Sequence, residues 1–293
     1  MSKRTRRRRC ATGHYWTPGY GAGNPERRYN WRMTTIHRQL VTFPTSQPAG
    51  TALAHVELDR AVAEVPTWSI HTLTAGPRRS SPGYDQHLRD TVGSSYDWSD
   101  EIRFDKQTGR LASFVLKMPE AGGVEPGIAR SWLALPRQAG IPVLDNRETG
   151  FHVDPVDLRW LADDGGALVA MDANMPVADS SSLRLAISNQ VDLVFHRGSY
   201  GGWILLNPVA HLVAASSDEV PGADDPRLHD LLREYLGLVI EPHVGRMCDE
   251  DPEIYSALQA LCARSREIDC VQARALLRSV ERVLEIFYYG YSG

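Results

Sequence analysis

The stretch EIRFDKQTGRLASFVLKMP, residues 101–119, is the clearest structural signal in this chain of 293 residues. Apolar residues alternate with other residues on both sides of the polar segment DKQTG, which is typical of a β-hairpin. We expect Gly109 to adopt the positive φ of the turn, because glycine has no Cβ to clash. The alternating positions are Ile102 and Phe104 before the turn and Leu111, Ser113 and Val115 after it.

Strand signals also predominate in the surrounding sequence, from about residue 36 to residue 215. Short apolar runs bounded by turn residues predict further strands at 67–73, 131–135, 141–144, 166–172, 183–188, 191–196 and from 203. Helices are expected in three places within this region, and the strand from 203 is expected to run into a loop or a short helix. The three helices are 52–65, ended by Pro66; 84–92; and 152–163, with Asp154 as N-cap and Pro155 at the first helical position.

Beyond about residue 224 the apolar residues recur with the period of an α-helix. The segments 224–239, 251–265 and 266–290 each carry an apolar stripe, and Gly290 stands where a C-terminal cap is expected. We therefore predict an α+β fold, with a mainly antiparallel, strand-rich body at about 36–215 and a C-terminal unit of about three helices. Segregation of strands from helices argues against a doubly wound parallel sheet.

Charge divides the chain unevenly. Residues 1–32 carry nine basic side chains and one acid, a net charge of +8, whereas the remaining residues carry 23 basic and 35 acidic side chains, a net charge of −12. The expected organisation is a disordered basic arm at 1–32, an α+β body at 33–220 and a helical unit at 221–293 packed on the body.

The basic arm has two interpretations. Its arginines and aromatic residues are suited to phosphate contacts and base stacking, so nucleic acid would bind through the arm, chiefly through Arg6, Arg7, Arg8 and Arg9. Alternatively, translation begins at Met33, and the arm is not part of the native protein.

The cysteines and the absence of long apolar runs predict a cytoplasmic location without membrane contact. No two cysteines have the C-x-x-C spacing of zinc or redox motifs, and we expect buried free thiols. No apolar run reaches the roughly 20 residues that a transmembrane helix needs, and the basic start is not followed by the apolar core of a signal peptide. The cysteines are Cys10, Cys248, Cys262 and Cys270.

The segment HRGSYGGW, residues 196–203, partly resembles the G-x-S-x-G turn of serine hydrolases. Ser199 would be the nucleophile and His243 its base. However, Arg197 occupies the position of the first glycine, and a strand rather than a helix is expected to follow. A hairpin with a glycine-rich turn explains the same residues.

His152 and Asp154 are the second candidate pair. Histidine and carboxylate side chains can hold a divalent metal or transfer protons, although Asp154 is also expected to cap a helix. The sequence contains no G-x-G-x-x-G and no P-loop motif, so no cofactor is predicted.

These observations favour a non-catalytic protein that binds a protein partner or a small ligand, of the bacterial immunity, antitoxin or regulatory type. An acidic body would then mask a basic partner. The first alternative is a hydrolase or metal-dependent enzyme that uses Ser199 with His243 or His152 with Asp154. The second is a nucleic-acid-associated protein acting through the arm. The apolar stripe of the last predicted helix can pack either within the chain or against a second copy, so a homodimer is a further alternative.

Overall fold

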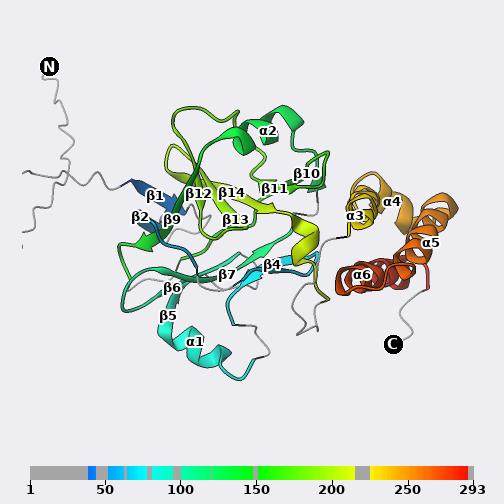
Figure 1. The fold of residues 1–293 in the computed structure, drawn as a ribbon, viewed down its shortest axis with the longest axis horizontal. Helices are drawn as coiled ribbons and strands as arrows, with labels where there is room; N and C mark the ends of the chain where they lie inside the picture. The colour runs from blue at the N-terminus through cyan, green and yellow to red at the C-terminus, as the bar shows by residue number, and fades with distance from the viewer. Residues whose placement is uncertain are drawn as a thin grey trace, which may run out of the picture. The chain divides into compact units, whose positions relative to one another are not determined.

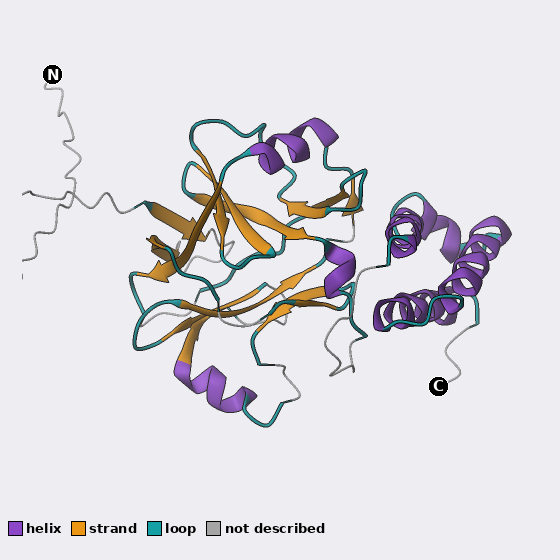
Figure 2. Cartoon of the chain, in the orientation of Figure 1, coloured by secondary structure: helices purple, strands orange, loops and turns teal. Residues whose placement is uncertain are grey.

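The computed structural model describes residues 39–43, 52–62, 65–77, 81–94, 100–119, 121–147, 151–214 and 225–289. In these residues, 14 strands form two sheets, and a set of helices follows them, so the α+β class is confirmed (Figures 1 and 2). None of the described helices combines the length and the apolar character that crossing a membrane requires.

The larger sheet has nine strands in the order β1-β2-β9-β12-β13-β14-β11-β10-β8. Most neighbours are antiparallel, but β9 and β12 are parallel, as are β10 and β8. The strands are β1 (Leu40–Phe43), β2 (Ala52–Leu58), β8 (Ala121–Gly122), β9 (Arg137–Leu144), β10 (Leu158–Leu161), β11 (Ala167–Met171), β12 (Ser182–Ala186), β13 (Val191–His196) and β14 (Ser199–Leu206).

Strand β1 also pairs with β14, which closes six of these strands into a ring. Thr42 lies opposite Ser199 in a parallel pairing, and the Thr42 amide donates a 2.6 Å hydrogen bond to the carbonyl of Gly198. Between β13 and β14, Arg197 and Gly198 both have positive φ, at 51° and 81°. A two-residue turn with this geometry matches the twist of the strands. The predicted hairpin at this position is therefore confirmed.

The smaller sheet has the order β3-β4-β7-β6-β5 and faces the larger one (Figure 1). The predicted hairpin at 101–119 forms β6 and β7, and Gly109 has a φ of 76°. Aromatic rings join the two sheets, since the Phe43 ring of β1 lies 5.9 Å from the Phe104 ring of β6; within the larger sheet, the Tyr200 ring lies 5.5 Å from that of Phe43. The strands are β3 (Thr67–Trp68), β4 (Thr72–Ala75), β5 (Thr91–Gly93), β6 (Glu101–Asp105) and β7 (Leu111–Lys117).

Three local predictions in the body are wrong. Residues 52–58 form β2 instead of a helix, because β1 and β9 pair with it on both sides and Ala54 and Val56 point inward at strand spacing. Residues 131–135 end helix α2 (Pro126–Ala134), which begins where the Glu125 carboxylate accepts from the amides of Gly127 and Ile128. The predicted helix at 152–163 is instead a loop followed by β10.

The body contains one further helix and one 3-10 turn. The predicted helix at 84–92 is found as α1 (Tyr84–Asp90), and β14 leads into η1 (Pro208–His211). The predicted strands 166–172, 183–188 and 191–196 are found as β11, β12 and β13.

The C-terminal part contains four described helices where about three were expected. The additional one is α4, a short helix between two of the predicted helices. Asp251 caps α5 as its position before Pro252 suggested, accepting from the amides of Glu253 and Ile254. The helices are α3 (Arg227–Leu238), α4 (His243–Cys248), α5 (Pro252–Arg266) and α6 (Val271–Phe287).

Arg159 of β10 connects the body to α3. Its side chain is buried, and its guanidinium donates to the carbonyls of Pro119, Leu236 and Val239 at 2.9, 3.3 and 2.9 Å. Two of these carbonyls belong to the end of α3, where the helix dipole is negative and carbonyls lack partners within the helix.

We expect Arg159→Met to lower the free energy of unfolding by about 2 kcal/mol, because buried carbonyls lose a charged donor. Chemical denaturation would measure this change. Arg233→Met is the control for an exposed contact, since the Arg233 side chain is 41% exposed, pairs with Asp230 and donates to the carbonyl of Asp163. Equal losses in the two variants would contradict the role of Arg159.

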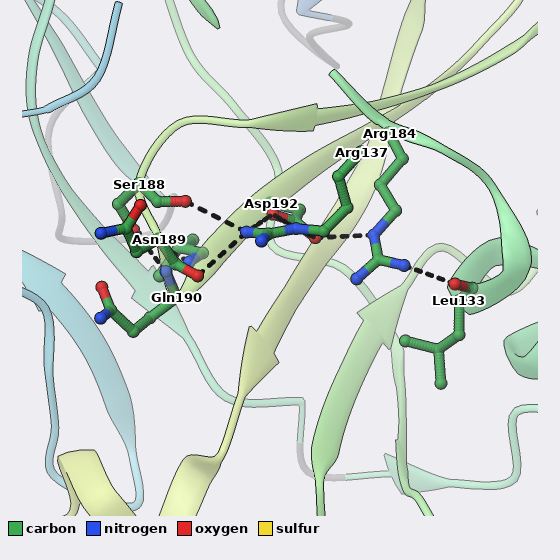
Figure 3. A network of polar contacts seen from close by, with 8 residues as sticks. Leu133, Arg137, Arg184, Ser188, Asn189, Gln190 and Asp192 are labelled. Atoms are coloured by element: carbon green, nitrogen blue, oxygen red, sulfur yellow. Dashed lines mark hydrogen bonds and ion pairs between the residues drawn. The ribbon is translucent and has the colours of Figure 1, made fainter. Parts of the chain in front are cut away.

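A network of charged side chains joins β9, β12 and β13 (Figure 3). The Asp192 carboxylate is completely buried and accepts from Arg184 Nε at 2.6 Å and from Arg137 Nη2 at 2.7 Å. Arg184 also donates to the carbonyl of Leu133 at the end of α2, and Arg137 donates to the carbonyls of Ser188 and Asn189. Because the Asp192 carboxylate is fully buried and both guanidiniums bind it together with backbone carbonyls, we interpret this network as structural.

Candidate functional site

Ser199 and His243 are not joined by any hydrogen bond that the structure records in its described part. Ser199 opens β14, whereas the other end of that strand leads into η1, which contacts α3 and α6. Eight residues of strand separate these ends by about 23 Å. The His243 ring lies within hydrogen-bonding distance of the Gly237 carbonyl, with Nδ1 2.9 Å from its oxygen. The described residues show no contact between the proposed nucleophile and the proposed base, so this pairing stays a prediction.

His152 and Asp154 do lie together. The distance from His152 Nε2 to Asp154 Oδ1 is 3.3 Å, and both belong to the loop before β10. Asp154 is therefore not a helix cap, contrary to the prediction. Across the described residues, no group of three or more His, Cys, Asp or Glu side chains is arranged to hold a metal ion. This pair alone supplies fewer protein ligands than a zinc site uses.

The remaining predictions concern the arm and the cysteines. Arg6, Arg7, Arg8 and Arg9 lie outside the described residues, together with Cys10. The other three cysteines are free, as predicted, but only Cys262 is fully buried, whereas Cys248 at the end of α4 is exposed.

Polar contacts that the sequence did not reveal hold α1 against the smaller sheet. Tyr84 donates to Glu101 Oε2 at 2.8 Å, and Arg103 donates to the carbonyls of Leu88 and Thr91 at 3.2 and 2.9 Å. Burial lowers the pKa of Arg103, while the nearby Glu101 carboxylate raises it. These contacts fix both ends of a helix that has only seven residues.

His87 and Ser113 form a further contact in this interface. The distance from His87 Nε2 to Ser113 Oγ is 2.7 Å, which a base and a nucleophile would require. Ser113, however, lies in the middle of β7 and is only 3% exposed. A Cβ at the neighbouring Gly76 would approach Ser113 Cβ to 2.3 Å, so the surroundings are closely packed. We interpret the pair as an attachment of α1 to the sheet.

Asp100 and Tyr200 are buried polar residues with unsatisfied atoms. Asp100 Oδ1 accepts from the amide of Lys117 at 2.7 Å, but Asp100 Oδ2 and the Tyr200 hydroxyl have no hydrogen-bond partner among the described residues. Burial raises the pKa of Asp100 to about 7, opposed by the Lys117 amide and charge. Burial also raises the pKa of Tyr200, with a smaller contribution from the charge of Asp100.

A cluster of tyrosines lies at the surface of the C-terminal helices. The ring of Tyr255 on α5 lies 5.1 Å from that of Tyr288 and 6.4 Å from that of Tyr289, both of which follow α6. Gln259 donates to the Tyr289 hydroxyl at 2.6 Å and fixes that ring. Tyr289 is 55% exposed, and Ile286 nearby in sequence is also exposed. Aromatic side chains in such a position are typical of protein interfaces.

An acidic segment adjoins these rings. Residues 241–253, EPHVGRMCDEDPE, carry five carboxylates and one guanidinium, a net charge of −4. Tyr288 donates to the carbonyl of Asp251 at 3.1 Å, and burial and the charges of Asp251 and Glu250 raise the pKa of its phenol. We call Tyr255, Tyr288, Tyr289, Asp249, Glu250 and Glu253 the tyrosine–acid surface.

The sequence contained only partial signals for this surface. The acids are evident as the run CDEDPE. The three tyrosines lie within the two segments that were predicted as helices, 251–265 and 266–290. Their proximity depends on how α5 packs against α6, which joins residues more than 30 positions apart. No protein family model, no curated protein and no solved structure matches this chain.

Proposed function

We propose that this chain is a non-catalytic binding protein. Its tyrosine–acid surface binds exposed basic side chains of a protein partner. The observation that supports this most is the contact of three tyrosine rings at the surface, directly beside a segment with a net charge of −4.

Both parts of the surface suit a cationic partner. Tyrosine faces attract guanidinium and ammonium groups, and exposed carboxylates add long-range attraction that steers association. Asp249 and Glu250 are exposed, and among the described residues their side chains form no hydrogen bond or ion pair. They can therefore engage an incoming cation without giving up a contact within the chain.

A labelled hexa-arginine peptide is a suitable probe, with hexa-glutamate as the negative comparison. We expect Tyr289→Ala to weaken binding of hexa-arginine about tenfold, because the most exposed ring of the cluster is lost. Fluorescence anisotropy at constant ionic strength would measure the affinity, and Val177→Ala, at another exposed apolar position, should leave it unchanged.

A matched pair of double variants tests whether the acids act locally. Asp249→Asn with Glu250→Gln removes two charges from the surface, and Asp163→Asn with Asp164→Asn removes two charges from the turn between β10 and β11. Only the first should weaken binding substantially. Equal weakening by both would show general attraction to an acidic protein and would overturn the proposed surface, as would wild-type protein that fails to bind hexa-arginine.

A further inference from the structure

The acidic segment of the tyrosine–acid surface already holds a guanidinium of its own chain. Arg246 of α4 donates from Nε to Asp251 Oδ2 and from Nη2 to Glu253 Oε2, both at 2.7 Å. Asp251 Oδ1 is used differently, since it accepts from the amides of Glu253 and Ile254 and caps α5. The cap and the ion pair thus use separate oxygens of one carboxylate.

This ion pair lies where an external group can reach it. The side chains of Arg246, Asp251 and Glu253 are 39%, 20% and 82% exposed, so Glu253 is the more accessible of the two carboxylates. The hydrogen bond from Arg246 lowers the pKa of Asp251, and Asp251 in turn raises the pKa of Arg246. Exposed ion pairs of this kind contribute little net free energy, so replacement by a second guanidinium costs the folded protein little.

We propose that Arg246 occupies the cation position of the tyrosine–acid surface in the free protein, and that a partner arginine displaces it on binding. This inference rests on the proposed function and specifies its partner chemistry. Asp251 and Glu253 present two carboxylates spaced to receive one planar guanidinium, and Tyr288 lies beside them. The guanidinium can donate to both carboxylates at once and stack on a tyrosine ring, whereas lysine offers a single point charge.

Two variants of Arg246 provide the test, again with labelled hexa-arginine as the probe. We expect Arg246→Gln to raise the affinity about fivefold, because two carboxylates are released from an exposed ion pair. Arg246→Lys keeps the charge but cannot span both carboxylates, so a smaller increase of a few-fold is expected. Hexa-lysine should gain less than hexa-arginine in both variants. Helical circular dichroism of each variant checks that the fold is retained.

Arg130→Gln is the control for net charge. Arg130 forms an exposed 2.7 Å ion pair with Asp163, so its replacement makes the protein more acidic by the same amount. Equal gains from Arg130→Gln and Arg246→Gln, or no gain from either Arg246 variant, would overturn this inference. If binding remains sensitive to Tyr289→Ala, the proposed function survives that outcome. If wild-type protein and both Arg246 variants all fail to bind, the proposed function fails as well.

Discussion

Replacing Asp192 with asparagine is expected to lower the free energy of unfolding by about 3–5 kcal/mol, the usual cost of removing one partner from a buried ion pair. The Asp192 carboxylate has no solvent exposure, and the Arg184 side chain is only 5% exposed (Figure 3). Without the negative charge, Arg184 keeps its hydrogen bond to Leu133 but remains a buried cation with no other counter-ion among the described residues. The loss also loosens β9, β12 and β13, which the network joins.

Urea denaturation at neutral pH would measure this effect. Asp163→Asn is the matched control, because it removes the same charge from an ion pair in which the Asp163 side chain is 78% exposed. Surface pairs contribute about 0–1 kcal/mol, so the control should change stability little. A loss below 1 kcal/mol for Asp192→Asn would contradict the interpretation of the network as structural.

The second large effect is a pH dependence of stability that arises from Asp100. The pKa of Asp100 is about 7 in the folded protein, and its ordinary value, which applies to the unfolded chain, is 3.8. Between these pH values the folded protein therefore binds more protons than the unfolded chain. The stabilising contribution is complete below pH 3.8, decreases as the pH rises, and is lost above pH 7. Each pH unit within this window corresponds to about 1.4 kcal/mol, which gives roughly 3 kcal/mol between pH 5 and pH 8.

Asp100→Asn isolates this contribution. The asparagine oxygen can still accept from the Lys117 amide but cannot ionise, so the variant should lack the decrease between pH 5 and pH 8 and should be more stable than wild type at pH 8. His211 acts in the opposite direction, because burial lowers its pKa and its contribution is lost as the pH falls. The comparison is therefore the difference between variant and wild type at each pH. Parallel curves would contradict the assignment.

Predictions from sequence succeeded where local signals and tertiary contacts favoured the same element. The 101–119 hairpin combines strict alternation with a glycine turn, and Asp251–Pro252 combines a cap with the first helical position. The predictions failed where hydrogen bonding between strands outweighed the local sequence signals. Asp154–Pro155 resembles a helix start, but the next residues pair along β11, and residues 52–58 gain hydrogen bonds from two neighbouring strands.

The candidate surface shows the same division. The sequence by itself determined the acidic segment, the helices that border it and the order of strands before helices, because composition and periodicity are local properties. Only the tertiary structure brought Tyr255 beside Tyr288 and Tyr289, and closed β1 onto β14. Contacts between distant residues depend on which apolar faces are buried together. A single sequence shows which face of an element is apolar, but not which other element packs against that face.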